Sequence, residues 1–495
     1  MKKTVCILMC LLLMLTLFSG CGNDYFSQYI YFQLNDAPVT LDPQSASSES
    51  ELLIVRNLYE GLLRKSDSGA VVCGACESFE QNGLIYTFTL RDELVWSDGT
   101  PVTADDFAFG IERALDPKTK SPFANRLMCI KGAKEFNGGK ADVSALGVTV
   151  VNKKTLTIEL AFDDPDFESA LASSVAMPCN REFFEESGGK YGREVEKILS
   201  NGSYYIAKWN KQDFGIRLYS NEDYNGDFVP QNAAVFLSLG GDEKTLELLE
   251  KDTIDMTVLD STDISGAKEK EFKVYNIDNI CWVLTVGGDF NLNVKKALAL
   301  SVLKEGYSKS LSDGFSIADS IYPNIIKEDT SEDYSVTLAY DIETAKQILS
   351  AEISKMPDKK FPQTTLYYYN DEAFKPCVTA VAGHWQKNLS AFVNIEAKDN
   401  LSYFSSQLKS GSLHLAIFPV YAKSSSGKEY LLDYGIDLYG TDKPLMSVEE
   451  ELLKSHSIIP LAYEQTNIVT TDNIKEIFID KENGYIDFSF VVKQE

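Results

Sequence analysis

The pattern of apolar and polar residues between positions 86 and 123 predicts a strand, a turn and a capped helix. Apolar and polar side chains alternate with a period of two at 86–90, which indicates a β-strand with one buried face. The sequence Asp-Gly-Thr-Pro at 98–101 then predicts a turn that ends the extended segment. Thr103 is in position to cap a helix, two aspartates follow it in the first turn, and Pro117 marks the helix end. The predicted buried face of this helix consists of Phe107, Ile111, Ala114 and Leu115.

Two other segments carry clear local signals. Alternating runs at 148–150 and 156–160 flank Asn-Lys-Lys at 152–154 and predict a β-hairpin. A capped helix is predicted from Asp341, with an apolar face made by Ala345, Ile348 and Leu349. None of these elements requires a ligand, so the local pattern predicts structure rather than function.

The pattern of the N-terminal residues predicts that the protein is exported from the cytoplasm. Lys2 and Lys3 precede an apolar run at 4–18 and small residues at 19–20, which is the pattern of a secretory signal peptide over residues 1–20. The run is too short to span a bilayer, which needs about 20 residues, and no later stretch is apolar enough to do so. The rest of the chain is therefore expected to be an exported, soluble body.

Residues 17–21, Leu-Phe-Ser-Gly-Cys, resemble a bacterial lipobox. The resemblance implies that Cys21 is lipidated and becomes the first residue of the mature protein, which would contact the membrane through this lipid anchor only. Two acyl chains give stable attachment, because each buried methylene contributes about 0.8 kcal/mol. The alternative is an ordinary cleaved signal with a chance cysteine, since Phe18 stands where leucine is usual.

Composition restricts the class of partner. The formal net charge is -26, and such an acidic surface repels phosphate backbones and argues against nucleic acid. With 495 residues, 44% of them apolar, the chain is long enough for two or three domains. Nothing in the sequence marks an oligomer face, so a monomer is expected.

Cys73 and Cys76 have the spacing of a redox or zinc motif, and export permits disulfides. A second Cys-x-x-Cys is absent from the sequence, and the histidines (His384, His414 and His456) have no ligand spacing to this pair. We therefore expect packing thiols or a local disulfide rather than a redox or metal site, and we assign neither a metal nor a cofactor.

The whole segment 86–123 resembles the signature of the family 5 extracellular solute-binding proteins, the oligopeptide- and dipeptide-binding components of ABC importers. Further matches keep their order and spacing along the mature chain, which is harder to produce by chance than any single motif. They are Leu-Asp-Pro at 41–43, Leu-Tyr-Glu-Gly-Leu at 58–62, Glu-Ser-Phe at 77–79, Asn-Gly-Ser-Tyr-Tyr at 201–205, Ile-Asp-Met-Thr at 254–257, Asn-Val-Lys-Lys-Ala-Leu at 293–298 and Ile-Ile-Pro-Leu at 458–461.

The resemblance implies an α/β fold: a two-lobed, periplasmic-binding-protein-like (type II) clamshell with an extra α/β domain and mixed sheets. Lobe I would combine residues 22–59, 176–279 and 468–495. The extra domain, 60–175, would carry the signature, and lobe II would be one insertion, 280–467. The ligand would lie between the lobes, with the two chain crossings acting as a hinge.

The function implied by the resemblance is that of a lipid-anchored receptor at the extracytoplasmic face of the bacterial cell membrane. It would capture an oligopeptide or other small solute and deliver it to the permease subunits of an ABC transporter. A second hypothesis keeps the binding role but assigns a non-peptide or anionic ligand, or a peptide sensor without transport. An enzyme is not expected, because no nucleophile elbow, His-Glu-x-x-His helix or credible triad is present, and no catalytic residue is assigned.

Candidate ligand-binding residues also follow from the resemblance. The family pairs with the ligand backbone just after Leu-Asp-Pro, which falls here around Ser48 and Glu49. Phe123 stands where peptide binders usually place a tyrosine, and Trp282 falls in their aromatic strand. For both aromatic residues, a plain core position is the competing interpretation.

The sequence departs from the family pattern at 420–431. Peptide binders carry Trp-x-Ala-Asp-Tyr here, and the aspartate binds the terminal ammonium of the peptide. In this chain Lys423 replaces that aspartate, and Tyr421 near it is a further candidate. A lysine at this position repels an ammonium and attracts a carboxylate or phosphate. Two other interpretations stay open: an acid such as Glu429 or Asp433 takes over the role, or Lys423 points to solvent.

Overall fold

The computed structural model describes residues 29–494 except 67, 211–214, 241–243, 260, 262, 288–289, 310, 312–313, 327–339, 442 and 481–484. The predicted signal peptide and Cys21 lie outside the described residues. Among the helices of the described ranges, none combines the length and the apolar composition that a bilayer crossing demands.

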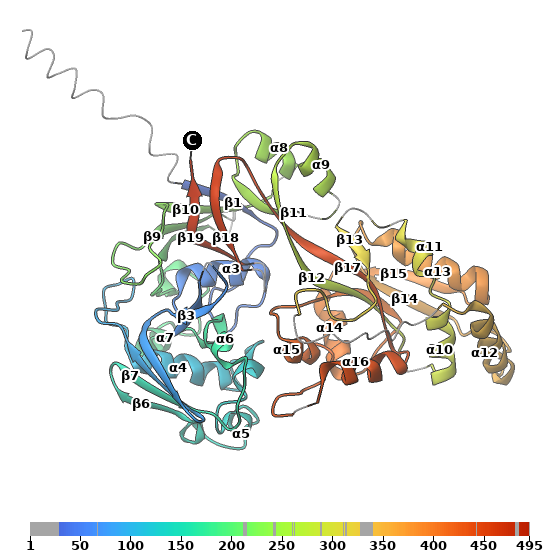
Figure 1. The fold of residues 1–495 in the computed structure, drawn as a ribbon, viewed down its shortest axis with the longest axis horizontal. Coiled ribbons are helices and arrows are strands. Elements are labelled where there is room, and N and C mark those ends of the chain that lie inside the picture. Colours follow the sequence, from blue (N-terminus) through green and yellow to red (C-terminus); the bar gives the residue numbers. More distant parts are fainter. Residues whose placement is uncertain are drawn as a thin grey trace, which may run out of the picture.

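The chain forms two lobes of mixed α/β structure, as predicted, and one large sheet runs through both of them (Figure 1). Within the described residues this sheet has eleven strands. In spatial order they are β15 (Val393–Lys398), β14 (Thr364–Tyr369), β16 (Ala416–Tyr421), β12 (Lys273–Thr285), β17 (Ile458–Thr470), β11 (Met256–Leu259), β1 (Tyr29–Leu34), β10 (Ala234–Leu239), β9 (Gly215–Ser220) and β8 (Tyr204–Asn210), with β13 (Phe315–Ile317) paired to β17.

Strands β12 and β17 connect the two lobes. They pair antiparallel along their length, and Thr285 lies opposite Ile458 at the end that belongs to the second lobe. One end of the pair adjoins β11 and the other end adjoins β16. The register shifts between Ile277 and Ile280, at the point where β12 begins to pair with β16 of the second lobe.

The predicted domain boundaries at 279/280 and 467/468 fall within these two strands. One buried core, packed around helices α10 (Leu292–Leu300), α12 (Ile342–Lys355) and α13 (Lys375–Leu389), consists of residues between Ile280 and Ala462. A larger core contains residues from both lobes and from the signature segment. The exact division of the chain into domains stays a prediction.

The signature segment forms the predicted strand, turn and helix. Strand β5 (Ile85–Leu90) lies in a four-stranded sheet of order β4-β5-β7-β6, and β6 and β7 form the predicted hairpin. Thr103 caps helix α4 (Ala104–Leu115), and its backbone N–H and hydroxyl donate to Asp106. The predicted face of α4 is buried, and these predictions are confirmed. The other strands of this sheet are β4 (Cys76–Asn82), β6 (Val148–Asn152) and β7 (Thr155–Glu159).

The remaining elements cover the sheets or connect them. The helices are α3 (Glu49–Leu58), α5 (Ala133–Asn137), α6 (Phe167–Leu171), α7 (Arg181–Glu186), α8 (Thr245–Glu250), α9 (Ile264–Glu269), α11 (Lys304–Ser308), α14 (Leu401–Ser410), α15 (Gly427–Leu432) and α16 (Leu445–Lys454), with short 3-10 helices η1 (Ala124–Leu127), η2 (Val143–Ala145), η3 (Ser174–Ala176) and η4 (Val195–Lys197). Two small two-stranded sheets pair β2 (Leu63–Lys65) with β3 (Val71–Cys73), and β18 (Ile474–Ile479) with β19 (Ile486–Lys493). Asp341 caps α12 as predicted, since its side chain accepts from the N–H of Thr344.

Cys73 and Cys76 form a disulfide, one of the two structural states that the sequence left open. The free cysteines of the described residues, Cys129, Cys179, Cys281 and Cys377, are all buried. Within the same ranges, no group of three His, Cys, Asp or Glu side chains is placed to hold a metal ion.

A buried ion pair joins the signature helix to the Leu-Asp-Pro loop. Arg113 of α4 donates from Nη2 to Asp42 Oδ2 at 2.7 Å and from Nη1 to Asp42 Oδ1 at 3.0 Å. The same guanidinium donates to Gln44 Oε1 at 2.6 Å, so one side chain orients the whole loop. Both partners of the pair are almost fully buried, so removing either charge would leave the other buried without a counter-charge.

Replacing Arg113 by methionine is expected to lower the free energy of unfolding by about 3–5 kcal/mol, because Asp42 is then buried without its cation. Urea unfolding of the variant measures this loss. The control is Lys131→Met, which removes an exposed ion pair with Glu159 and is expected to cost less than about 1 kcal/mol. Equal losses in the two variants would contradict the structural role of the buried pair.

Candidate functional site

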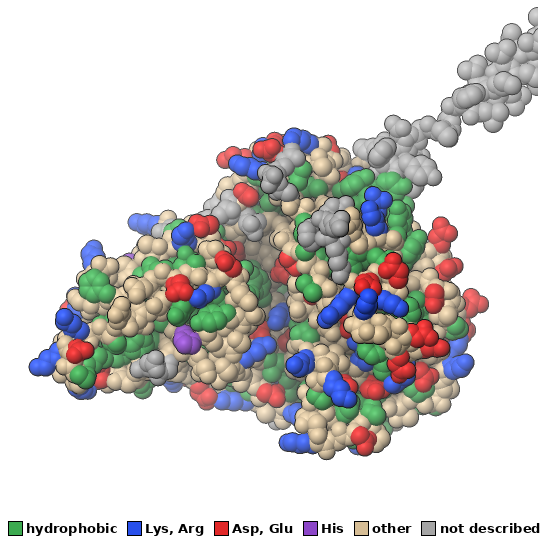
Figure 2. All heavy atoms as spheres, turned by 180° about the vertical axis from the view of Figure 1, so that it is seen from behind, with side chains coloured by type: hydrophobic (Ala, Val, Ile, Leu, Met, Phe, Trp, Pro, Cys, Tyr) green, Lys and Arg blue, Asp and Glu red, His purple; other side chains and the backbone are tan. Residues whose placement is uncertain are grey.

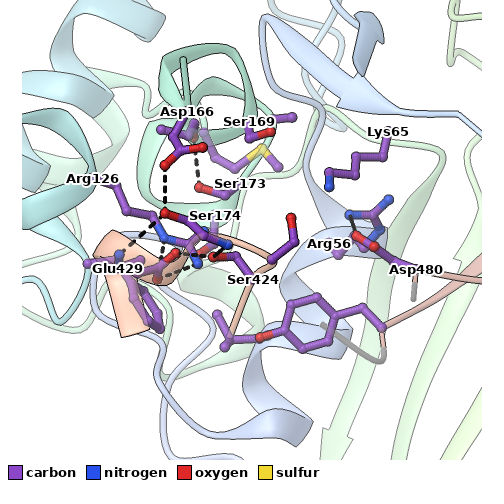
Figure 3. Close-up of a pocket in the computed structure, with 18 of the residues that line it drawn as sticks. Arg56, Lys65, Arg126, Asp166, Ser169, Ser173, Ser174, Ser424, Glu429 and Asp480 are labelled. Atoms are coloured by element: carbon purple, nitrogen blue, oxygen red, sulfur yellow. Dashed lines mark hydrogen bonds and ion pairs between the residues drawn. The ribbon is translucent and has the colours of Figure 1, made fainter. Parts of the chain in front are cut away.

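A cavity lies between the two lobes. Figure 2 shows the hollow that separates them at the surface, and Figure 3 shows the side chains around the cavity. Its empty space, counted together with the open solvent at its mouth, is about 850 Å³, but the room inside it for water-sized groups is only about 70 Å³. A bound solute therefore requires the lobes to lie further apart than they do here. One wall comes from α3, β2 and the segments around η1 and α6, and the facing wall comes from residues 424–426, α15 and Tyr439.

Charged contacts tie the two walls together at one end of the cavity. Arg126 of η1 donates from Nε to Glu429 Oε1 of α15 at 2.7 Å, and from Nη2 to the carbonyl oxygen of Lys423 at 3.3 Å. Ser426, the N-cap of α15, donates to Asp166 Oδ2 at 2.5 Å. Dashed lines in Figure 3 mark the contacts of Arg126 with Glu429 and of Ser426 with Asp166. In each of these contacts the donor lies on one lobe and the acceptor on the other, so the contacts hold the lobes together.

The ion pair of Arg126 with Glu429 is largely shielded from water. The two side chains are 13% and 11% exposed. Burial opposes the charge of Arg126, but the Glu429 carboxylate outweighs it and raises the pKa of the guanidinium. Ser424 donates to the second oxygen of Glu429, which fixes the carboxylate further. Nothing in the spacing of the sequence marks Arg126, because its partner is 303 positions away.

Lys423 lies beside this contact. Its Nζ is 3.4 Å from Asp433 Oδ2 and 5.6 Å from the ring centre of Phe123. Asp433 also pairs with Lys409 at 3.0 Å. The two acids that were the alternative ammonium anchors, Glu429 and Asp433, are thus both paired with cations of the protein itself.

The structure brings three of the predicted site residues together. Phe123, Tyr421 and Lys423 line one small space at the edge of the cavity, and Phe123 also lines the cavity itself. Burial raises the pKa of Tyr421 well above its usual value, and the Glu49 carboxylate on the other lobe adds to this shift. Tyr421 and Glu49 therefore interact across the lobes.

Ser48 and Glu49 lie at the start of α3. Ser48 is the N-cap, and its hydroxyl accepts from the N–H of Glu51 at 3.3 Å. Glu49 is exposed, and it lines a neighbouring space with Asp36. The surrounding protein, which limits hydration of the carboxylate, and then the charge of Asp36 raise the pKa of Glu49 above its usual value.

Trp282 lies apart from the other candidates. Its side chain is 1% exposed and stacks on Phe374, with ring centres 3.9 Å apart. Its Nε1 donates to Glu464 Oε2 at 2.7 Å. The indole is therefore a core group with one polar contact, and its role in ligand binding stays a prediction, as does that of the other five candidates.

Sequence reasoning missed other residues of the cavity wall. Arg56, Lys65 and Arg126 are basic residues from α3, β2 and η1, and no periodicity distinguishes them from surface charges. The serines at 424–426 were visible in the sequence only as a short polar run. Their position on the facing wall depends on tertiary structure.

Comparison with known proteins places this architecture in a family. The model of the bacterial extracellular solute-binding proteins, family 5 Middle, matches residues 70–437. The oligopeptide-binding protein OppA of Bacillus subtilis is 28% identical over 426 residues, which cover 80% of this chain and 78% of that protein. The periplasmic murein peptide-binding protein MppA of Escherichia coli is 30% identical over 404 residues, which cover 77% and 73%.

The solved structure of Listeria monocytogenes OppA bound to peptide has a TM-score of 0.80 at 20% identity, and covers 94% of this chain and 99% of its own. This likeness establishes the two-lobed type II fold. The family and the relatives are binding proteins rather than enzymes, and they act outside the cytoplasm. Because the family model matches most of the chain, the protein belongs to the bacterial extracellular solute-binding proteins of family 5.

Proposed function

We propose that this protein captures an oligopeptide between its two lobes and delivers it to the permease subunits of an ABC transporter. The observation that carries this proposal is the cavity with walls from both lobes, in a chain whose relatives are named oligopeptide- and murein peptide-binding proteins. In this role the protein is a monomeric receptor, and ATP hydrolysis by other subunits supplies the energy for import.

The chemistry of the cavity wall suits a peptide. Serine oxygens at 424–426 and 173–174 can accept from backbone N–H groups of a peptide, which lose free energy when buried without partners. The hydroxyl hydrogens of Ser424 and Ser426 already donate to carboxylates of the protein. Phe123, Tyr439 and Tyr485 provide aromatic surface for side chains. Charged groups of both signs line the wall, where they can lie near the termini and ionised side chains of a peptide.

Capture requires the lobes to move relative to each other. We propose that β12 and β17, which carry the chain between the lobes, serve as the hinge. Closure then buries the ligand, and the contacts of Arg126 and Ser426 with the facing lobe favour the closed arrangement. The permease would recognise the closed form.

The proposal includes attachment to the outer face of the cell membrane through lipidated Cys21. The basis is the sequence Leu-Phe-Ser-Gly-Cys at 17–21 after a signal-like apolar run. Cys21 shortly precedes β1, which begins at Tyr29, so the body would lie close to the membrane. Proximity to the surface raises the chance of contact with a permease embedded in it.

The ligand class is tested by native mass spectrometry of the mature protein purified from cells. Adducts whose masses differ by amino-acid residues are expected, because the cavity offers pairing groups for any peptide backbone. One discrete non-peptide mass would contradict the oligopeptide and support a different solute. Uptake of the bound peptide by cells with and without the gene then separates an importer from a sensor.

The anchor is tested by the Cys21→Ser variant. Wild-type protein is expected to take up radiolabelled palmitate and to sediment with membranes, whereas the variant loses the label and appears in the soluble fraction. Cys129→Ser, which changes a buried thiol, serves as the control and should keep the label. Unlabelled wild-type protein would indicate an ordinary cleaved signal.

Closure is tested with Glu429→Gln, which removes the charge that Arg126 faces across the lobes. Because Arg126 is left largely buried without its partner, the closed arrangement loses stability. The expected result is a larger radius of gyration by small-angle X-ray scattering and a peptide affinity about tenfold lower. Glu343→Gln, which breaks an exposed pair with Lys346 on a single helix, should change neither quantity. Identical scattering from Glu429→Gln and the wild type would argue against the interlobe contact.

A further inference from the structure

Arg56 differs from the other cations of the cavity in having few partners. Its side chain is 13% exposed and projects from the last turn of α3 to the cavity wall. Its Nε and Nη2 atoms are buried and have no hydrogen-bond partner within the described part of the chain. Its Nη1 lies 3.8 Å from Asp480 Oδ2, which is an ion pair but longer than a hydrogen bond.

The position of the unpaired atoms on the guanidinium is informative. Nε and Nη2 form one edge of the planar group, and this edge binds a carboxylate with two parallel N–H···O bonds. The ion pair with Asp480 is made through Nη1, which is not one of these two atoms. Burying charged donors without acceptors costs free energy, so the site is complete only when another acceptor is present.

The surroundings of Arg56 favour an anion. Lys65, 6% exposed, lines the same end of the cavity, and Figure 3 shows it next to Arg56, with Asp480 on the other side. The other acids of the wall, Asp166 and Glu429, lie at the opposite end of the view and accept hydrogen bonds from Ser426 and Arg126.

We propose that Arg56 forms a subsite for a carboxylate of the bound solute. The proposal rests on the proposed capture of a peptide between the lobes, and it specifies peptides that place a C-terminal or side-chain carboxylate at this end of the cavity. The anion enters while the lobes are apart, and closure then shuts the two unpaired nitrogens and the carboxylate away from water. The preference for acidic peptides is thereby set by lobe I and the extra domain, away from the loop that contains Lys423.

The test compares peptides that differ only in charge. Ala-Ala-Glu-Ala and Ala-Ala-Gln-Ala, each as the free acid and as the C-terminal amide, are titrated by calorimetry into unfolded-and-refolded, ligand-free mature protein. The wild type is expected to bind at least one acid about tenfold more tightly than its neutral counterpart. Arg56→Gln is expected to abolish this preference while leaving the affinity for the neutral peptide within about twofold. Arg181→Gln, which changes an exposed arginine paired with Glu112, should keep the preference.

A second variant protects the test from misfolding. Because Arg56→Gln leaves Asp480 buried, Arg56→Gln combined with Asp480→Asn removes both charges of the pair. Loss of the preference in this variant, with a wild-type circular dichroism spectrum, supports the subsite. Equal affinities for acid and neutral peptides in the wild type, or an unchanged preference in both variants, would overturn it while leaving peptide capture intact. Absence of binding to all four peptides would overturn the peptide proposal and this subsite together.

Discussion

The antiparallel pairing of β12 with β17 carries the main chain between the two lobes and sets where their facing walls lie. Because residues on neighbouring strands keep a fixed register, the ladder that places Glu464 beside Ile280 also places Tyr421 on the next strand. The register shift between Ile277 and Ile280 interrupts this ladder near the crossing. In the hinge proposed above, a local irregularity at that point would allow the lobes to change their angle without breaking the pairing at either end.

Elements with local signals could be predicted from the sequence. The turn at 98–101, the cap at Thr103 and the alternation in β5 depend on neighbours a few residues away, and all three are present in the structure. The two-lobed fold was predicted from the order of the family motifs along the chain. The ion pair of Arg113 with Asp42 shows how two of these motifs contact each other in the structure. A buried pair explains why these two distant motifs occur together.

The candidate site was harder to predict because its contacts join distant parts of the chain. Sequence alone indicated a reversed charge at Lys423, but it did not show that Asp433 accompanies it. The pairing of Arg126 with Glu429 spans two lobes. The Nε and Nη2 atoms of Arg56 have no hydrogen-bond partner among the residues that the structure describes, and only tertiary structure shows this. An aromatic residue such as Trp282 has the same pattern in a core as in a pocket, so only packing distinguishes the two.

The contact of Arg126 with Glu429 has a thermodynamic consequence for a receptor that works by closing. Contacts supplied by the protein itself favour the closed form at every ligand concentration, so they raise apparent affinity by enlarging the closed fraction. The same contribution narrows the free-energy difference between the open and closed forms of the empty receptor. A transporter that recognises only the closed form would then bind empty, closed receptors more often. Closure of the lobes would therefore distinguish loaded from empty receptors less well, even though the ligand is bound more tightly.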